Sequence, residues 1–227
     1  YVLTRYVFSE VGDRLVNGIS SADMLAVIRQ IEARGKFETA RRILGYCGSV
    51  FRYAVVTGRA DNDPTSALKG ALQRAKKKHF SAITDPKKVA GLIRAIDGYE
   101  GTFSVECALR LAPILFVRPG ELRKAEWTDI DLEKSEWRYL VTKTDTAHIV
   151  PLAAQAVEIW KRLYRITGKG KYVFPSPRTD ERPMSDNAVL SALRRMGISK
   201  EEMTGHGFRA MARTILDEVL GYRPDII

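Results

Sequence analysis

The chain has 227 residues, 45% of them hydrophobic and 28% charged, which is enough to bury one large core or two smaller ones. Lys and Arg number 37 against 27 Asp and Glu, and the resulting net charge of +10 and pI near 9.7 favour a polyanionic partner. The longest apolar stretch, residues 111–117, is too short to cross a bilayer, and Cys47 and Cys107 lack zinc-ligand spacing, which excludes those two classes.

The first 80 residues predict a helical domain. Apolar residues recur at helical spacing from a cap near Ser21 until Gly35, and again from Glu38 to Thr57. A short third helix is predicted after Pro64, with Leu68, Leu72 and Ala75 on its buried face. The stripe predicted to be buried on the long second helix consists of Ala40, Ile43, Leu44, Cys47, Val50, Phe51, Ala54 and Val55.

A basic run over residues 74–79 separates this domain, residues 1–80, from a second one, residues 81–227. The run contains Lys76, Lys77 and Lys78 and is the densest positive segment of the chain. It has two interpretations: a solvated linker, or a strap that lies against a phosphate backbone.

The second domain mixes helices with a few strands. Helices are predicted after Asp85, over 104–115, from Pro119, over 153–166, over 186–196 and over 207–220. Strands are predicted over 137–142, 148–151 and 172–174. The whole chain therefore predicts a mainly α fold with a small β-sheet, an α+β architecture.

Several common kinds of catalytic site lack their sequence signatures. The chain has no P-loop, no dinucleotide-binding glycine motif and no nucleophile elbow. Asp129, Asp131 and Glu133 are close together, but their position before a strand favours a solvated turn over a two-metal site. We expect no metal and no cofactor.

Basic residues at three places are candidate functional residues. Arg118 directly follows an apolar run, where it needs a partner, and Glu121 is spaced to fix its guanidinium. Lys143 lies where a strand passes into a turn, and His206 with Arg209 opens the last helix. Each also has a structural interpretation: a salt bridge, an exposed hairpin lysine, and an interior hydrogen-bonded histidine.

Together these segments resemble the motifs of the tyrosine recombinase (phage integrase) family, particularly the integrases of prophages and genomic islands. Residues 118–123 with 125–127 resemble its first arginine box, 142–152 its hairpin lysine segment, and 205–209 its His-x-x-Arg box. Residues 41–64 resemble the helical core-binding domain that precedes the catalytic domain. The resemblance covers nearly the whole chain.

The resemblance implies a site-specific recombinase that works without metal or ATP. In that family a tyrosine hydroxyl attacks a DNA phosphodiester, leaving a 3′-phosphotyrosine and a free 5′-hydroxyl. By the resemblance, Arg118 and Arg209 clamp the nonbridging oxygens, Lys143 protonates the departing 5′-oxygen, and Glu121 orients the site. His206 donates to the phosphate or helps to deprotonate the nucleophile.

The sequence departs from the family pattern near its end. Of nine tyrosines only Tyr222 follows the His-x-x-Arg box, and its place after Gly221 favours a turn residue. We therefore expect the nucleophilic tyrosine and a second His or Trp to lie beyond Ile227, and an arm-type DNA-binding domain to lie before Tyr1. A chain that begins without Met is then an excised fragment, which we expect to bind DNA without cleaving it.

The implied partner is double-stranded attachment-site DNA, on which we expect tetramers, in the cytoplasm of a bacterium or of a phage-infected cell. Arg41, Arg42 and Arg52 are candidates for DNA contacts, with an ordinary solvated helix face as the other interpretation. Two alternatives stay open: a non-catalytic DNA-binding regulator with the same fold, and a helical protein–protein adaptor.

Overall fold

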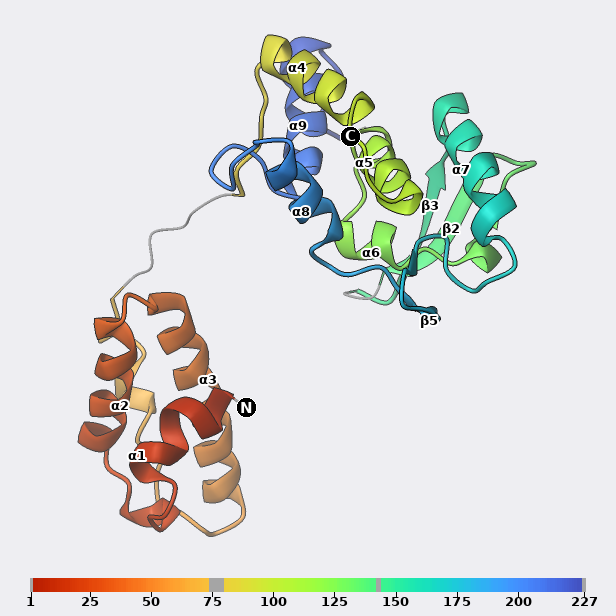
Figure 1. Cartoon of the computed structure of the whole chain (residues 1–227). Coiled ribbons are helices and arrows are strands. Elements are labelled where there is room, and N and C mark those ends of the chain that lie inside the picture. Colours follow the sequence, from red (N-terminus) through yellow and green to blue (C-terminus); the bar gives the residue numbers. More distant parts are fainter. Residues whose placement is uncertain (1, 74–79, 142–143, 226–227) are drawn as a thin grey trace. The chain divides into compact units, whose positions relative to one another are not determined.

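A computed structural model describes residues 2–73, 80–141 and 144–225 of the chain. The chain folds as two compact units, Tyr1–Lys78 and His79–Ile227 (Figure 1). Lys76, Lys77, Lys78 and Lys143 lie outside the described residues.

The first unit consists of helices. A π-helical turn (Thr4–Phe8) leads into α1 (Ser9–Val11), and a 3-10 turn (Val16–Gly18) precedes α2 (Ser21–Ala33) and α3 (Phe37–Val56). A final 3-10 turn spans Ser66–Leu68. Burial of one apolar stripe from each helix forms a single core, which contains Val7, Val11, Met24, Val27, Ile28, Ile31, Ala40, Ile43, Leu44, Cys47, Phe51 and Leu68.

Local chemistry sets the helix ends in this unit. The N-cap of α2 is Ser20 rather than Ser21, because Asp23 completes a capping box with Ser20. Gly35 takes a left-handed φ of 71° after the helix. The predicted stripe of α3 was wrong at Val50 and Val55, which are 49% and 37% exposed. They lie at the margin of the stripe, where the core ends.

The predicted third helix of this unit was also wrong. Only the 3-10 turn at Ser66–Leu68 forms, and Ala75 lies outside the described residues. The carboxylate of Asp63 caps this turn by accepting hydrogen bonds from both the backbone N–H and the hydroxyl of Thr65.

The second unit is a mixed α+β domain, as the sequence predicts. Its helices are α4 (Pro86–Asp97), α5 (Phe103–Leu115), α6 (Pro119–Arg123), α7 (Ala154–Thr167), α8 (Ala188–Arg195) and α9 (Gly207–Thr214), with a π-helical continuation over Ile215–Val219. Its strands are β1 (Ile130–Asp131), β2 (Glu136–Val141), β3 (Thr146–Pro151), β4 (Pro175–Ser176) and β5 (Thr179–Pro183).

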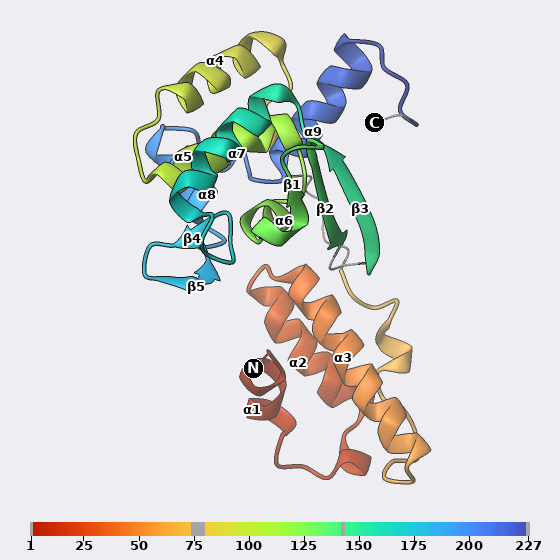
Figure 2. The same ribbon diagram turned by 90° about the vertical axis from the view of Figure 1, so that its right-hand side faces the viewer.

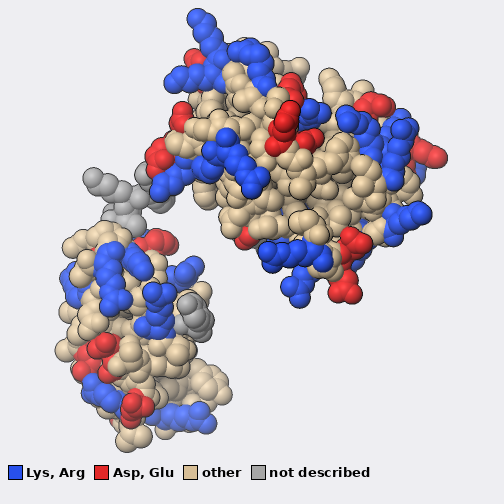
Figure 3. Space-filling model, viewed as in Figure 1, with Lys and Arg blue, Asp and Glu red and all other residues tan. Residues whose placement is uncertain are grey.

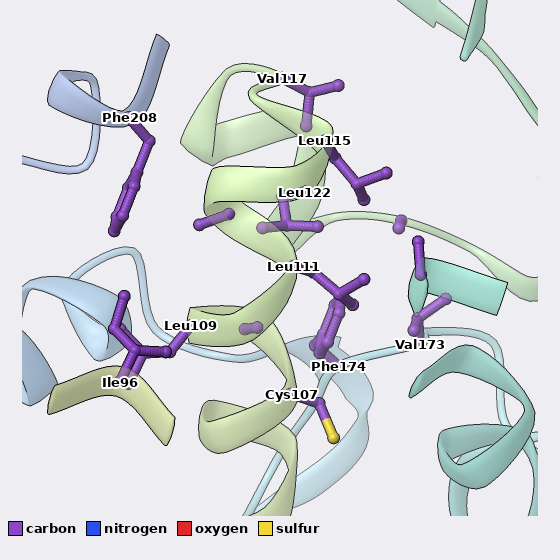
Figure 4. Close-up of a cluster of buried hydrophobic side chains, with 14 of the residues drawn as sticks. Ile96, Cys107, Leu109, Leu111, Leu115, Val117, Leu122, Val173, Phe174 and Phe208 are labelled. Carbon is purple, nitrogen blue, oxygen red and sulfur yellow. The ribbon is translucent and has the colours of Figure 1, made fainter. Parts of the chain in front are cut away.

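Helix α5 forms the centre of this unit. It contacts α4, α6, α7, α8 and α9, and it has buried residues on more than one side. Leu109 and Leu111 are both fully buried yet point to opposite sides of the helix (Figure 4). Burial of each such leucine contributes about 2 kcal/mol to stability. A rigid central helix therefore fixes the position of the residues that follow its carboxyl end.

The three-stranded antiparallel sheet has the order β1-β2-β3 (Figure 2). Strand β1 was not predicted, because Ile130 and Asp131 were read as part of a polar turn. The strand predicted over residues 172–174 was wrong as well: Tyr172 makes only an isolated bridge to Glu126. Val173 and Phe174 are apolar because they are fully buried in the core, and strand pairing begins only at β4.

Candidate functional site: a cationic cluster around Arg118 and Arg209

Arg118 lies at a sharp change of direction between α5 and α6. Helix α5 ends at Leu115 and is capped by Phe116, whose left-handed φ of 35° is unusual for a residue with a side chain and stores about 1–3 kcal/mol of strain. Arg118 is then the N-cap of α6, and Pro119 is its first residue. The turn leaves the arginine side chain partly accessible, at 41% exposure, at the edge of the buried core.

Glu121 holds Arg118 from two sides. One carboxylate oxygen accepts a hydrogen bond from the guanidinium of Arg118 at 2.6 Å. The other accepts a hydrogen bond from the backbone N–H of Arg118 at 3.1 Å. The hydroxyl of Tyr139, on β2, donates to that second oxygen at 2.9 Å. The predicted contact between Arg118 and Glu121 is therefore present, on a carboxylate that is only 9% exposed.

These contacts fix the charges of the group. Burial acts to raise the pKa of Glu121, but the hydrogen bonds from Arg118 and Tyr139 outweigh it and the net shift is downward. The same carboxylate raises the pKa of Arg118. Burial first, and then the bond to Glu121, raise the pKa of Tyr139 well above its ordinary value. The site therefore holds a carboxylate, a guanidinium and a neutral phenol.

Arg209 reaches the same place from α9. Its guanidinium donates to the carbonyl oxygen of Phe116 at 2.8 Å, two residues before Arg118. The two segments also pack directly: a side chain at Gly205 would meet the ring of Pro119 at 3.1 Å. The strained turn at Phe116 thus presents a carbonyl that anchors the second arginine beside the first.

His206 is the N-cap of α9 and stacks on Phe80, with ring centroids 4.6 Å apart and planes inclined by 20°. The carbonyl of Ser81 accepts both the backbone N–H and the hydroxyl of Thr204, at 3.1 and 3.2 Å. A Cβ at Gly207 would lie 2.5 Å from that same oxygen. The segment after residue 79 is therefore packed tightly against the loop that carries the histidine.

Packing brings these residues to one place, because Arg209 is hydrogen-bonded to Phe116, close to Arg118, and His206 caps the helix of Arg209. Burial lowers the pKa of His206, and the charges of Arg209 and Arg118 lower it further. Both arginines also act on Tyr139. Arg118, Arg209 and His206, distant in sequence, therefore share one field, with Glu121 and Tyr139 behind Arg118. Because its pKa is held below the ordinary histidine value, the imidazole is mostly uncharged at neutral pH.

A groove of about 850 Å³ borders this cluster, lined by Phe116, His148 and Arg209 and extending to Arg213 and Tyr222. Tyr222 follows Gly221 and donates its backbone N–H to the carbonyl of Leu216 at the helix end. Lys143 lies outside the described residues, between the end of β2 and the start of β3.

The other predicted contact residues belong to the first unit. Arg41, Arg42 and Arg52 are all exposed on α3. Arg52 pairs with Asp63 at 3.4 Å, whereas Arg41 and Arg42 make no ion pair within the described parts of the chain. Basic side chains occur on the surfaces of both units (Figure 3). Lys76, Lys77 and Lys78, predicted to contact DNA, lie outside the described residues.

Sequence reasoning missed Tyr139 and Phe80. A signal for Tyr139 existed, because strand periodicity places it on the same face as the buried Trp137 and Val141, where a hydroxyl needs a partner. Phe80 gave no comparable signal, since its contact with His206 joins residues far apart along the chain.

Several features bear on other kinds of site. Within residues 2–73, 80–141 and 144–225, no group of three or more His, Cys, Asp or Glu side chains could hold a metal ion. Among the same residues no helix combines the length and apolarity that crossing a membrane requires. Cys47 and Cys107 are buried free thiols, and burial raises the pKa of each to about 11.

Two protein-family models match the chain. The model described as the phage integrase central domain matches residues 1–71. The model described as the phage integrase family matches residues 83–221, which include Arg118, Glu121, Lys143, His206 and Arg209.

Curated relatives cover nearly all of the chain. It is 35% identical to an integrase of Enterobacteria phage P4, over 95% of this chain and 52% of the relative. It is 34% identical to the putative protein IntB of Escherichia coli K12, over 93% of this chain and 57% of the relative. The chain thus spans about half the length of the curated relatives it matches.

Solved structures share the fold at low sequence identity. A lambda integrase dimer bound to a COC′ core site has a TM-score of 0.72 at 19% identity, over 96% of this chain and 77% of that one. A lambda integrase tetramer bound to a Holliday junction has a TM-score of 0.71 at 19% identity, over 94% of this chain and 62% of that one. The Tn1549 transposon integrase in complex with transposon right end DNA has a TM-score of 0.72 at 15% identity, over 99% of this chain and 82% of that one.

Proposed function

The chain belongs to the phage integrase family of tyrosine recombinases, and we propose that the protein containing it is a site-specific DNA recombinase. In this proposal the protein cleaves and rejoins DNA through a 3′-phosphotyrosine intermediate. The 227 residues supply the core-type DNA-binding domain and most of the phosphate-binding site.

The observation that carries the proposal is the convergence of Arg118, Arg209 and His206. The guanidinium of Arg209 donates to the carbonyl of Phe116, two residues before Arg118, and His206 is the N-cap of the helix that carries Arg209. Attack on a phosphodiester builds negative charge on the two nonbridging oxygens, and preorganised donors stabilise that charge. A guanidinium suits this task because it stays protonated and donates two parallel hydrogen bonds. Glu121 supports the assignment, because it fixes the rotamer of one arginine before DNA binds.

Each residue has a defined role in the proposed reaction. Arg118 and Arg209 bind the nonbridging oxygens of the scissile phosphate. His206, uncharged at neutral pH, donates to the phosphate or accepts the proton of the nucleophile. Lys143 protonates the departing 5′-oxygen. The nucleophile in this proposal is a tyrosine hydroxyl, which attacks the phosphorus and releases the 5′-oxygen.

DNA is the proposed partner. The exposed Arg41, Arg42 and Arg52 on α3, with Lys76, Lys77 and Lys78, are proposed to contact the duplex of an attachment site. The structural neighbours include integrases bound to DNA as a dimer and as a tetramer. On that basis we propose that the protein assembles as a tetramer on DNA. The phage and Escherichia coli relatives support a location in the bacterial cytoplasm.

The test is covalent trapping by a protein that includes these residues together with the segments encoded on either side of them. Binding sites are first selected from a randomised duplex library with the 227-residue chain. A nicked suicide substrate built on the selected site should then give a covalent complex, and peptide mapping should identify one tyrosine on the 3′ end. A DNA-binding regulator with the same fold would select a site and yield no covalent complex.

A second substrate tests Lys143. Replacing the bridging 5′-oxygen by sulfur supplies a leaving group that needs little protonation. Cleavage by Lys143→Ala should be slow on the oxygen substrate and recover on the sulfur substrate, whereas Arg118→Ala should stay slow on both. A Lys143→Ala protein that is equally slow on both substrates contradicts the general-acid role.

A further inference from the structure

We propose that Tyr139 is a positioning residue whose hydroxyl, acting through Glu121, ties the β2–β3 hairpin to the guanidinium of Arg118. The inference rests on the proposed function and adds a residue to it. Tyr139 touches neither the phosphate nor Arg118 in the proposed reaction; it acts through the carboxylate of Glu121.

The hydrogen bonds to Glu121 come from two different parts of the domain. Two of the donors, the guanidinium and the backbone N–H, belong to Arg118 itself. A carboxylate held only by those two could move together with Arg118. Among the described residues, Tyr139 supplies the hydrogen bond that comes from outside the α5–α6 turn, from a strand 18 residues further along. That bond fixes the pair against the rest of the domain.

The ring of Tyr139 is held by contacts with neighbouring aromatic rings. Its ring lies 4.4 Å from the ring of Trp137, which is fully buried and packs edge-on against Trp160 at 5.5 Å. The ring of Tyr139 also meets the ring of His148 edge-on, with centroids 5.4 Å apart, and His148 is its direct partner across the hairpin. Packing against these two rings limits the movement of the phenol ring, so its hydroxyl can act as a fixed donor.

The β2–β3 hairpin contains two further residues of the proposed site, Lys143 and His148. Strand β2 ends at Val141, and Lys143, the proposed general acid, follows two residues later in sequence. His148, on β3, lines the same groove as Arg209. A bond from β2 to Glu121 therefore sets the distance between the strand that leads to the lysine and the arginine that binds the phosphate, and a catalytic geometry needs that distance held.

The decisive variant is Tyr139→Phe, which removes the hydroxyl and keeps the ring between its neighbours. In the protein that includes the flanking segments, we expect single-turnover cleavage of the suicide substrate to fall roughly tenfold, the effect of one hydrogen bond to a charged group. The DNA dissociation constant should not change. Tyr164→Phe, whose exposed ring meets Trp127 at 5.1 Å far along the chain from this contact, is the matched control and should cleave at the normal rate.

A double-mutant cycle separates positioning from a general structural role. If Tyr139 acts through Glu121, then adding Tyr139→Phe to Glu121→Gln should slow cleavage no further than Glu121→Gln alone. Multiplicative losses, or normal cleavage by Tyr139→Phe, overturn the inference. If the unsubstituted protein forms no covalent complex, the proposed function fails and the inference falls with it, whereas an active protein unaffected by Tyr139→Phe overturns the inference alone.

A spectroscopic measurement on the 227-residue chain tests the contact without catalysis. Among the described residues, Arg118 and Tyr139 donate hydrogen bonds to the carboxylate of Glu121, and the ring of His148 packs against Tyr139. Since the hydroxyl favours the ionised carboxylate, Tyr139→Phe should raise the pKa of Glu121 as followed by carboxyl ¹³C chemical shift. An unchanged titration means that the bond does not hold Glu121, and it overturns the inference.

Discussion

Arg118 and Arg209 differ in what holds them, and the difference matters for how each can act. Arg118 is paired with a nearly buried carboxylate that also binds its backbone. Among the residues that the structure describes, Arg209 is held by one carbonyl, that of Phe116, and it remains exposed. One arginine therefore has a fixed rotamer, whereas the other is anchored at one nitrogen and keeps donors free for an anion.

Replacement of Arg209 tests the phosphate clamp. We expect Arg209→Ala in the complete protein to raise the activation free energy of cleavage by about 3–4 kcal/mol. Most of the DNA affinity should remain, because many other phosphate contacts contribute to binding. Cleavage of the suicide substrate and DNA binding by gel shift measure the two quantities. Arg165→Ala, which removes an exposed charge on α7, is the control. Near-normal cleavage by Arg209→Ala would remove that residue from the mechanism.

The stacking of Phe80 on His206 makes a prediction about pH. The folded chain holds the pKa of His206 below its usual value, first by burial and then by the two arginines. Phe80→Ala uncovers one face of the imidazole, so the pKa should rise toward its ordinary value, as measured by NMR titration of the ring protons. Phe8→Ala removes a similarly exposed phenylalanine from the first unit and should leave that titration unchanged.

The sign of the linked stability effect follows from the same shift. Because the folded state binds the His206 proton more weakly than the unfolded state does, stability is full above the ordinary histidine pKa. It is lost as the pH falls through that value toward the lowered one. Phe80→Ala should therefore reduce this acid-side loss, and a larger loss in the variant would contradict the assigned cause.

At the level of elements, the packing of α9 against the segment from Phe80 to Ala82 depends on Gly207. A methyl group there would lie 2.5 Å from the carbonyl oxygen of Ser81 and 2.8 Å from the sulfur of Met203. The backbone oxygen also accepts two bonds from Thr204, so it cannot move without breaking them. The loop that carries His206 thus requires glycine for close approach.

The expected result of Gly207→Ala is a loss of about 1–3 kcal/mol in the free energy of unfolding, measured by denaturant titration. Gly91→Ala in α4 is the matched control, since a Cβ there meets nothing within 4 Å. That change should stabilise the chain by about 0.5–1 kcal/mol, because alanine reduces the entropy of the unfolded state. A Gly207→Ala protein as stable as the Gly91→Ala protein would show that the approach is not tight.

The strain at Phe116 belongs to the same scale. Its left-handed conformation ends α5 without a glycine and turns its carbonyl toward Arg209. Strain of this kind persists only where the surroundings fix it, here the packed helix α5 before it and the capped helix α6 after it. The junction of two elements, rather than either element alone, creates the anchor for the second arginine.

For the whole molecule, the charge of +10 predicts how strongly DNA binding depends on salt. Each phosphate neutralised by Lys or Arg releases counterions, so affinity should fall linearly on logarithmic axes, roughly a thousandfold or more between ~50 and ~200 mM salt. Fluorescence anisotropy with a selected duplex measures this. Arg41→Ala combined with Arg42→Ala should lower the slope by about 2 if both contact phosphates. An affinity that ignores salt would favour the protein–protein adaptor instead.

Much of this molecule could be predicted from its sequence, because the decisive signals were local. The 3.6-residue spacing of apolar residues predicted α2, α3, α4, α5 and α7 within a few residues of their observed bounds. The alternation around Trp137 predicted the hairpin, and the three-residue spacing of Arg118 and Glu121 predicted their contact. In each case the residues that decide the structure are neighbours along the chain.

Tertiary structure decided what depends on contacts between distant segments. The left-handed turn at Phe116, the bond of Tyr139 to Glu121 and the stacking of Phe80 on His206 join residues that no periodicity relates. The incorrect strand prediction for Val173 and Phe174 has the same cause. Both residues are apolar because they fill a core built by other elements, and not because they belong to a strand. Local spacing fixes hydrogen bonding within an element, whereas the packing of elements decides which side chains meet, and the candidate site is formed by that packing.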